Sequence, residues 1–152
     1  MSLSHRSHLK IIFLFLCINM IVNCSDPKPP AEQQILDNTK TAIEAIEQLK
    51  PQALREILAP NFEIVGSHKY YDYALIKKTM MLFSFRKQKI NIMLSSTTAT
   101  LDPYNSQLAS MTSTAVVTGG KGLLPEDGRI YKVTSEWRLY DSQWRITNLN
   151  WK

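Results

Sequence analysis

The last part of the chain alternates apolar and polar residues with the period of a β-strand. Residues 129–152 read RIYKVTSEWRLYDSQWRITNLNWK, two runs rich in β-branched and aromatic residues that are separated by Asp141 and Ser142. Two such runs around a short polar interruption predict an antiparallel β-hairpin. We expect the rest of the chain to cover one face of this hairpin or to extend its edge.

The alternation also predicts which hairpin side chains point toward the interior. With a two-residue loop, Leu139 faces Trp144 and Trp137 faces Ile146 across the strands. In the same register, the inward face consists of Val133, Ser135, Trp137, Leu139, Trp144, Ile146, Asn148 and Asn150. This face is aromatic and aliphatic near the turn and mixed farther along.

Leu149 and Trp151 interrupt the alternation on the opposite face. Either a β-bulge changes the register near Thr147, or something covers that end of the sheet. If the two side chains are exposed, they would suit the seam of a homodimer.

Upstream, apolar residues recur at helical spacing. Residues 31–50 have an apolar stripe with Glu, Gln and Lys between its members, which predicts an amphipathic helix. Pro51 begins a second, short helix that Pro60 ends. Asp72 is positioned to N-cap a third helix reaching about Arg86. Apolar residues occupy most of the circumference of this third helix, so we expect it to be mostly buried.

Three further strands are predicted at residues 61–65, 89–101 and 107–118, with a turn between the last two. Helices followed by a run of strands indicate an α+β fold, with N-terminal helices packed on a strongly curved, cone-like antiparallel sheet.

The N-terminus has the pattern of a secretory signal. Residues 1–10 are polar and basic, residues 11–22 are apolar, and Cys24 follows. The apolar run is shorter than the roughly 20 residues needed to span a bilayer. We therefore expect it to direct export rather than to cross the membrane permanently.

The tetrapeptide Ile21-Val22-Asn23-Cys24 resembles a bacterial lipobox, although Asn23 stands where a small residue is usual. The resemblance implies a signal peptide at 1–23, a lipidated Cys24 with a Pro-rich tether at 24–30, and a domain at 31–152. Ser25 after the cysteine resembles the pattern of proteins sent to the outer membrane. The implied location is the bacterial envelope, on the periplasmic face of the outer membrane, through a lipid anchor.

Charge and cysteine content narrow the function classes. Cys17 lies within the signal, so with Cys24 acylated the domain has no thiol for a disulfide, a metal site or a nucleophile. Removing Arg6 and Lys10 from the formal +5 leaves +3 for residues 24–152, which is too weak and scattered to predict a nucleic-acid partner. His68 stands alone and predicts no metal site.

The order of the elements, with LREILAPNFEI near the start and WRLYDSQWRITNLNW at the end, resembles the nuclear-transport-factor-2-like superfamily, also called the cystatin-like α+β cone. The segment TGGKGLLPEDGRIYKV further resembles small uncharacterised bacterial lipoproteins of that superfamily. This fold hosts isomerases, dehydratases, epoxide hydrolases and non-catalytic binding domains, so it does not by itself imply an activity. We read the glycines of this segment, from Gly119, as permitting positive φ, not as a phosphate loop.

The predicted inward face contains no acid, no amine and no imidazole. Its serine and asparagines can orient a ligand but cannot transfer protons near neutral pH. We therefore expect a non-enzymatic module, without catalytic residues, cofactor or metal, that binds a small apolar ligand or an envelope protein. The candidate pocket residues are Tyr70, Tyr73, Ser135, Trp137, Trp144, Asn148 and Asn150. The tyrosines would otherwise pack at the rim, and the asparagines would bond to each other or to water.

An enzyme acting on a small hydrophobic substrate is the alternative. It requires a carboxylate inside the cone, and only Glu63, Asp72 and Asp102 are suitably placed in sequence. A homodimeric assembly module is a further alternative.

The third predicted helix has a basic edge that continues beyond its end. This edge would either be solvated or contact anionic lipid, and it consists of Lys77, Lys78, Arg86, Lys87 and Lys89.

Overall fold

The computed structural model describes residues 29–65, 70–119 and 129–152, and these form an α+β fold as predicted. The helices are α2 (Ala31–Glu47), α3 (Pro51–Ile57) and α4 (Tyr73–Phe85). The strands are β1 (Leu58–Val65), β2 (Tyr70–Asp72), β3 (Asn91–Leu101), β4 (Leu108–Thr118), β5 (Arg129–Tyr140) and β6 (Gln143–Trp151). The predicted signal, Cys24, most of the tether and His68 lie outside the described residues.

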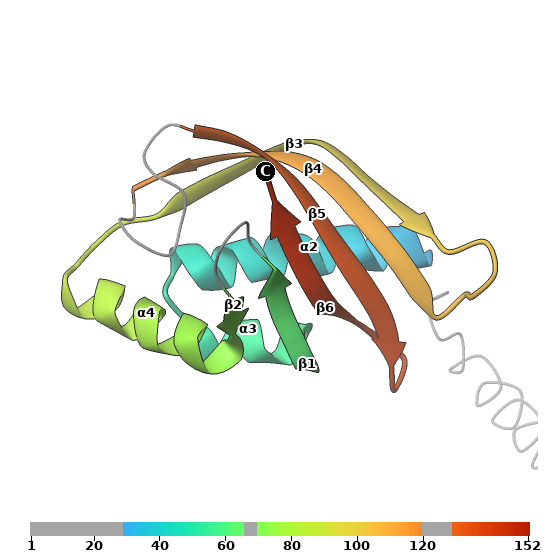
Figure 1. The fold of residues 1–152 in the computed structure, drawn as a ribbon, viewed down its shortest axis with the longest axis horizontal. Helices are drawn as coiled ribbons and strands as arrows, with labels where there is room; N and C mark the ends of the chain where they lie inside the picture. The colour runs from blue at the N-terminus through green and yellow to red at the C-terminus, as the bar shows by residue number, and fades with distance from the viewer. Residues whose placement is uncertain (1–28, 66–69, 120–128) are drawn as a thin grey trace, which may run out of the picture.

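The strands form one six-stranded sheet in the order β2-β1-β6-β5-β4-β3 (Figure 1). Strands β3 to β6 make the predicted antiparallel meander. The sequence did not predict that β1 lies beside β6 and runs parallel to it, nor that β2 adds an antiparallel strand to β1. The parallel pair fixes the first strand of the domain to the last.

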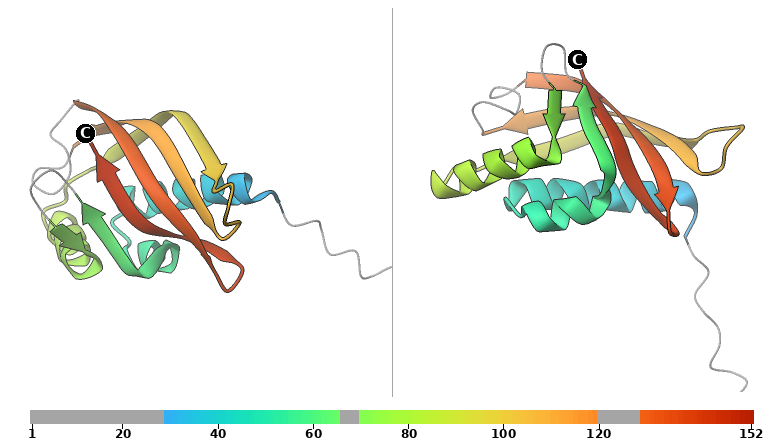
Figure 2. Two further views of the ribbon diagram at one scale, coloured as in Figure 1. Left: turned by 45° about the vertical axis from the view of Figure 1, so that its right-hand side comes forward. Right: turned by 60° about the horizontal axis from the view of Figure 1, so that its bottom comes forward.

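The helices lie on the concave side of the curved sheet (Figures 1 and 2). Helix α2 crosses beneath the sheet and buries Ile35, Thr39, Ala42 and Ala45, which are three or four residues apart and therefore share one face. Pro51 occupies the first turn of α3 as predicted, and that helix buries its own apolar side against the same core.

Helix α4 lies at the end of the cone remote from the β5–β6 turn. The Asp72 carboxylate accepts a hydrogen bond from the Leu75 backbone N–H at 2.8 Å, which confirms the predicted N-cap. The expectation that α4 is mostly buried is wrong, because only Met80 and Phe83 are buried. Phe85 is 87% exposed, since α4 contacts the rest of the domain along one side only.

The β5–β6 hairpin has the predicted two-residue turn. Asp141 and Ser142 both have positive φ, the combination that matches the twist of a two-residue hairpin. Leu139 pairs with Trp144, and Trp137 pairs with Ile146, as predicted. The register near the turn therefore follows the sequence pattern.

Farther from the turn the register shifts by one residue. Ser135 pairs with Leu149 and Glu136 pairs with Asn148, so Thr147 is the extra residue of a β-bulge on β6. The bulge alternative near Thr147 is thus confirmed. It turns Leu149 and Trp151 inward, and the prediction that Asn148 and Asn150 face inward is wrong.

Gly119, at the end of β4, occupies a position that only a residue without a side chain can fill. Gly119 has φ +77°, as the sequence predicted, and a Cβ there would lie 2.1 Å from the carbonyl oxygen of Lys89. The end of β4 therefore approaches the start of β3 more closely than any side chain permits.

Candidate ligand cavity

A cavity of about 200 Å³ lies between the concave face of the sheet and helices α2 and α4. All described elements except β2 contribute to its wall. The floor comes from inward side chains of β4, β5 and β6, and the helical wall consists of Thr39, Ala42, Ile43 and Ile46 of α2 with Ile76, Thr79, Met80 and Phe83 of α4. The bulge at Thr147 matters here, because it adds Leu149 and Trp151 to the wall.

The described lining is almost entirely aliphatic and aromatic. Its polar groups are the hydroxyls of Thr39, Thr79, Ser113, Tyr131 and Ser135 and the indole N–H groups of Trp137 and Trp151. Among the lining residues that the structure describes, none carries a carboxylate, an imidazole, an amine or a guanidinium. Such a wall favours an uncharged, mostly apolar molecule, because an unpaired charge is costly to bury there.

The hydroxyls on the sheet and on α2 differ in their partners. The Thr39 hydroxyl donates to the Ile35 carbonyl at 2.8 Å and lies 3.2 Å from the Met111 sulfur. Ser135 Oγ accepts a hydrogen bond of 2.8 Å from the Trp137 indole nitrogen. Ser113 is only 3% exposed, and its hydroxyl has no partner within the described chain.

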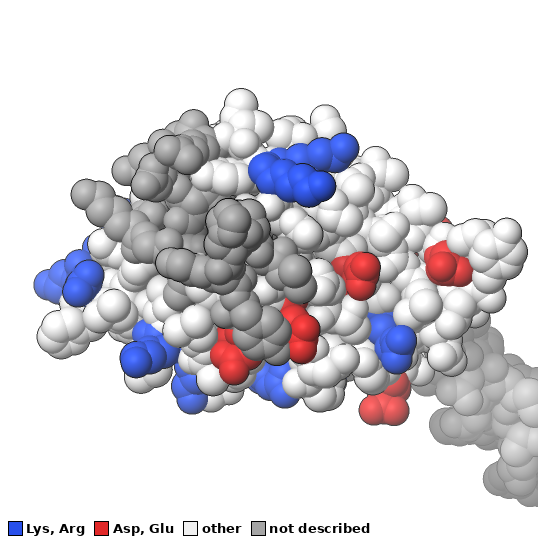
Figure 3. Space-filling model, viewed as in Figure 1, with Lys and Arg blue, Asp and Glu red and all other residues white. Residues whose placement is uncertain are grey.

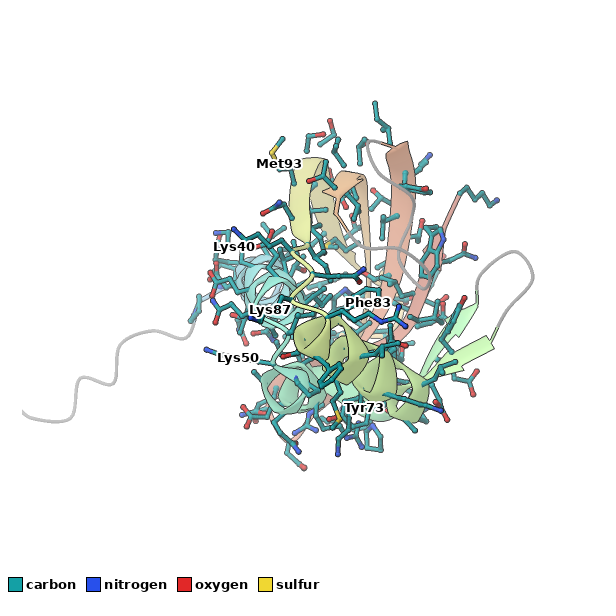
Figure 4. All side chains as sticks on the ribbon, turned by 90° about the vertical axis from the view of Figure 1, so that its left-hand side faces the viewer. Lys40, Lys50, Tyr73, Phe83, Lys87 and Met93 are labelled. Carbon is teal, nitrogen blue, oxygen red and sulfur yellow. The ribbon has the colours of Figure 1, made fainter. Side chains whose placement is uncertain are left out.

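Several predicted pocket residues lie elsewhere. Ser135 and Trp137 line the cavity, whereas Trp144 is buried in the core beside it. The Tyr73 hydroxyl donates to the Pro51 carbonyl at 3.1 Å, so this residue packs against α3 and not into the cavity. Figure 4 shows Phe83 on the side of α4 toward the sheet and Tyr73 on the side toward α3. The side chain of Tyr70 lies outside the described part of the structure.

Asn148 and Asn150 lie on the opposite face of the sheet. There they line a second, polar hollow together with Lys132, Thr134, Glu136 and Lys152. Leu149 and Trp151, the residues expected at a homodimer seam, instead line the cavity, and Trp151 stacks on Tyr71 at 6.5 Å between ring centroids. A homodimer seam at Leu149 and Trp151 was suggested on the condition that their side chains are exposed on the outer face of the sheet. That condition is not met, because both side chains line the cavity.

The three carboxylates suggested for an enzyme do not line the cavity. Asp72 caps α4, and Asp102 accepts hydrogen bonds from the backbone N–H groups of Tyr104 and Asn105 at 2.8 and 2.9 Å. Glu63 is partly exposed on β1. Within the described ranges, no group of three His, Cys, Asp or Glu side chains could hold a metal ion.

Sequence reasoning missed the contribution of β4. Met111, Ser113, Ala115 and Val117 are all buried and all line the cavity. Their spacing of two residues is visible in the sequence, but small polar residues on both faces of this strand make the alternation weak. The matching alternation in β5, which brings Tyr131 into the wall, was likewise not assigned to the site.

Comparison with known proteins gives the fold and no more. No protein-family model matches the sequence, and no curated protein sequence matches it. Solved structures do match. An NTF2-like protein from Cytophaga hutchinsonii is 14% identical with a TM-score of 0.68, over 82% of this chain and 98% of that one.

Two other solved structures illustrate the range of proteins with this shape. An NTF2-like protein of unknown function from Pseudomonas putida is 13% identical, with a TM-score of 0.64 over 80% of this chain and 85% of that one. A protein from Shewanella frigidimarina, described as a candidate ketosteroid isomerase, is 18% identical, with a TM-score of 0.61 over 78% and 94%. The chain therefore has the NTF2-like, or cystatin-like, cone fold. At these identities the likeness extends to the fold alone.

Proposed function

We propose that this chain is an envelope lipoprotein whose cone domain binds a small, mostly apolar ligand without changing it chemically. The observation that carries the proposal is the cavity of about 200 Å³, whose described wall offers apolar surface, hydroxyls and indole N–H groups but no charged side chain. An engineered apolar cavity of about 150 Å³ is large enough to take benzene. A single-ring aromatic or short branched aliphatic compound therefore fits the space.

The wall also argues against an enzyme that transfers protons. A general acid or base must lie within hydrogen-bond reach of the substrate. The carboxylates of Asp72 and Asp102 are engaged with backbone N–H groups outside the cavity, and Glu63 does not line it. Binding is the function that the described lining supports.

Attachment to the membrane rests on Cys24. None of the described helices is long and apolar enough to cross a membrane. The tether at 24–30 would connect a lipid on Cys24 to the start of α2, which lies at the same end of the domain as the β5–β6 turn (Figures 1 and 2). The mature chain should label with radioactive palmitate, and Cys24→Ser should abolish the label. Persistent labelling of Cys24→Ser would refute the anchor.

Native mass spectrometry of the protein purified without detergent tests the binding function. We expect a single small apolar compound in substoichiometric amount, and we expect it to be recovered unchanged after prolonged incubation with fresh protein. Conversion of that compound to a product would favour the enzyme instead. A protein that carries nothing and accepts no apolar compound would refute the proposal.

Contact of α4 with anionic lipid is a second candidate function. Met81, Leu82 and Phe85 are 58%, 44% and 87% exposed. Lysine and arginine side chains lie along the margin of the molecule that α4 forms (Figure 3), and the sequence places Lys77, Lys78, Arg86, Lys87 and Lys89 there. An apolar patch beside cations suits the surface of an anionic bilayer.

Flotation with vesicles containing one-third phosphatidylglycerol tests this contact, using a chain that begins at Ser25 so that neither the apolar signal nor a lipid contributes. Phe85→Ser should reduce flotation severalfold. Equal flotation of both chains, or flotation of neither, would refute the contact of α4 with lipid.

Homodimerisation and binding of an envelope protein are separate predictions. The elution volume in gel filtration would test homodimerisation, and crosslinking in cells would test binding of an envelope protein.

A further inference from the structure

Ser113 is the one buried hydroxyl in the cavity floor for which the described chain supplies no partner. It lies near the middle of β4, is 3% exposed, and lines the cavity. Buried side-chain hydroxyls nearly always have a hydrogen-bond partner. An orphaned hydroxyl that faces a ligand-sized space indicates that the partner belongs to the ligand.

The neighbouring strand places a second hydroxyl close to the first. On the β4–β5 ladder Met111 pairs with Ser135 and Ser113 pairs with Val133, so the two serines are diagonal neighbours on the same inward face. Ser135 Oγ accepts from the Trp137 indole N–H. A serine hydroxyl has one proton to donate besides the lone pairs with which it accepts, so Ser135 retains a donor.

The surroundings of this pair are apolar. Of the hydroxyls on the helical wall, that of Thr39 already donates to the Ile35 carbonyl. A buried water molecule is typically held by about three hydrogen bonds. Two diagonal serines supply two, the low end of the usual range of two to four, so the pair is better suited to a polar atom that is covalently part of a larger apolar molecule.

We propose that the ligand is an uncharged amphiphile with an aromatic or aliphatic body and one hydroxyl or carbonyl oxygen, which hydrogen-bonds to Ser113 and, beside it, Ser135. A carboxylate or an ammonium is excluded because the described wall has no opposite charge to pair with it. This inference rests on the proposed function, since it specifies the ligand class for the same cavity.

Toluene and p-cresol, which differ by one hydroxyl, provide the test. Calorimetric titration of the purified full chain, held in lipid nanodiscs with empty nanodiscs as the blank, measures both. We expect p-cresol to bind about fivefold more tightly than toluene. In Ser113→Ala, the p-cresol affinity should fall about tenfold while the toluene affinity stays within about twofold. Ser113→Thr, which keeps the hydroxyl, should restore the preference.

Ser110→Ala is the matched control, because Ser110 is on the same strand but exposed. It should bind both compounds like the unmodified chain. Equal binding of toluene and p-cresol that Ser113→Ala leaves unchanged would overturn the inference while the binding function stands. Failure of both compounds to bind any variant would instead refute the binding function.

Ser113→Ala also has a readout in the absence of ligand. Because Ser113 has no partner in the described chain, its removal should leave the melting temperature unchanged or raise it. A loss of cooperative unfolding, or a clearly lower melting temperature, would show that the hydroxyl has a structural role and would overturn the inference.

Discussion

Ser135 of β5 pairs with Leu149 of β6, although an uninterrupted hairpin would pair it with Asn148. This single pairing determines the character of the cavity. It places Leu149 and Trp151 in the wall and moves two asparagines to the other side of the sheet. With an uninterrupted register, the amide side chains of these asparagines would line the interior. With the bulge, the interior is mostly apolar and its polar groups are mainly hydroxyls.

The shifted register predicts an asymmetric result for two neighbouring substitutions. Leu149→Ala should lower the free energy of unfolding by about 1–3 kcal/mol, because a partly buried leucine loses its apolar contacts. Asn148→Ala should change it by no more than about 0.5 kcal/mol, since this residue lies on the outer face. Urea denaturation measures both, and the reverse ranking would contradict the bulge.

The hydrogen bond between Trp137 and Ser135 predicts a cost for removing the serine hydroxyl. Ser135→Ala leaves the indole N–H of a fully buried tryptophan without its 2.8 Å acceptor. We expect a loss of about 1–3 kcal/mol in the free energy of unfolding. Thr134→Ala, one residue away and exposed, is the control and should be nearly neutral. A neutral Ser135→Ala would show that the indole N–H has another acceptor.

The two phenylalanines near the end of α4 make a matched pair. Phe83 is 3% exposed and packs with Ile90 and Val117, whereas Phe85 is 87% exposed. Phe83→Ala should cost about 3–5 kcal/mol of stability, and Phe85→Ala no more than about 0.5 kcal/mol. Thermal unfolding followed by circular dichroism distinguishes them. Similar losses would mean that the exposed side of α4 is covered.

The fold class and most of the elements were predictable, because they depend on local patterns. The amphipathic stripe of α2, Pro51 at the start of α3 and Asp72 as an N-cap each have a signature within one or two turns. The parallel pairing of β1 with β6 was not predictable in this way. It joins segments that are far apart in the sequence, and no local pattern encodes that contact.

The site was predicted less completely than the fold. Ser135 and Trp137 were found because they alternate cleanly near the hairpin turn. Asn148 and Asn150 were misplaced because one extra residue on a strand moves every later side chain to the other face. Ser113 was missed because serine and threonine occupy both faces of β4, so the sequence does not show which hydroxyls are buried.

The burial of α4 was overestimated for a different reason. Its apolar residues occupy most of the helix surface, and composition alone predicts burial on all sides. The domain provides a packing surface for one side only, so Met81, Leu82 and Phe85 remain exposed.

Filling the cavity while measuring the binding of toluene is the most direct test of the central claim. Ala115 is buried on the cavity floor, and Ala115→Leu places a larger side chain in that space. We predict saturable binding at one site in the unmodified chain and at least a tenfold weaker affinity, about 1.4 kcal/mol, in Ala115→Leu, with unfolding still cooperative. Toluene binding that Ala115→Leu leaves unaffected, or no binding by the unmodified chain, would contradict a ligand site inside the cone.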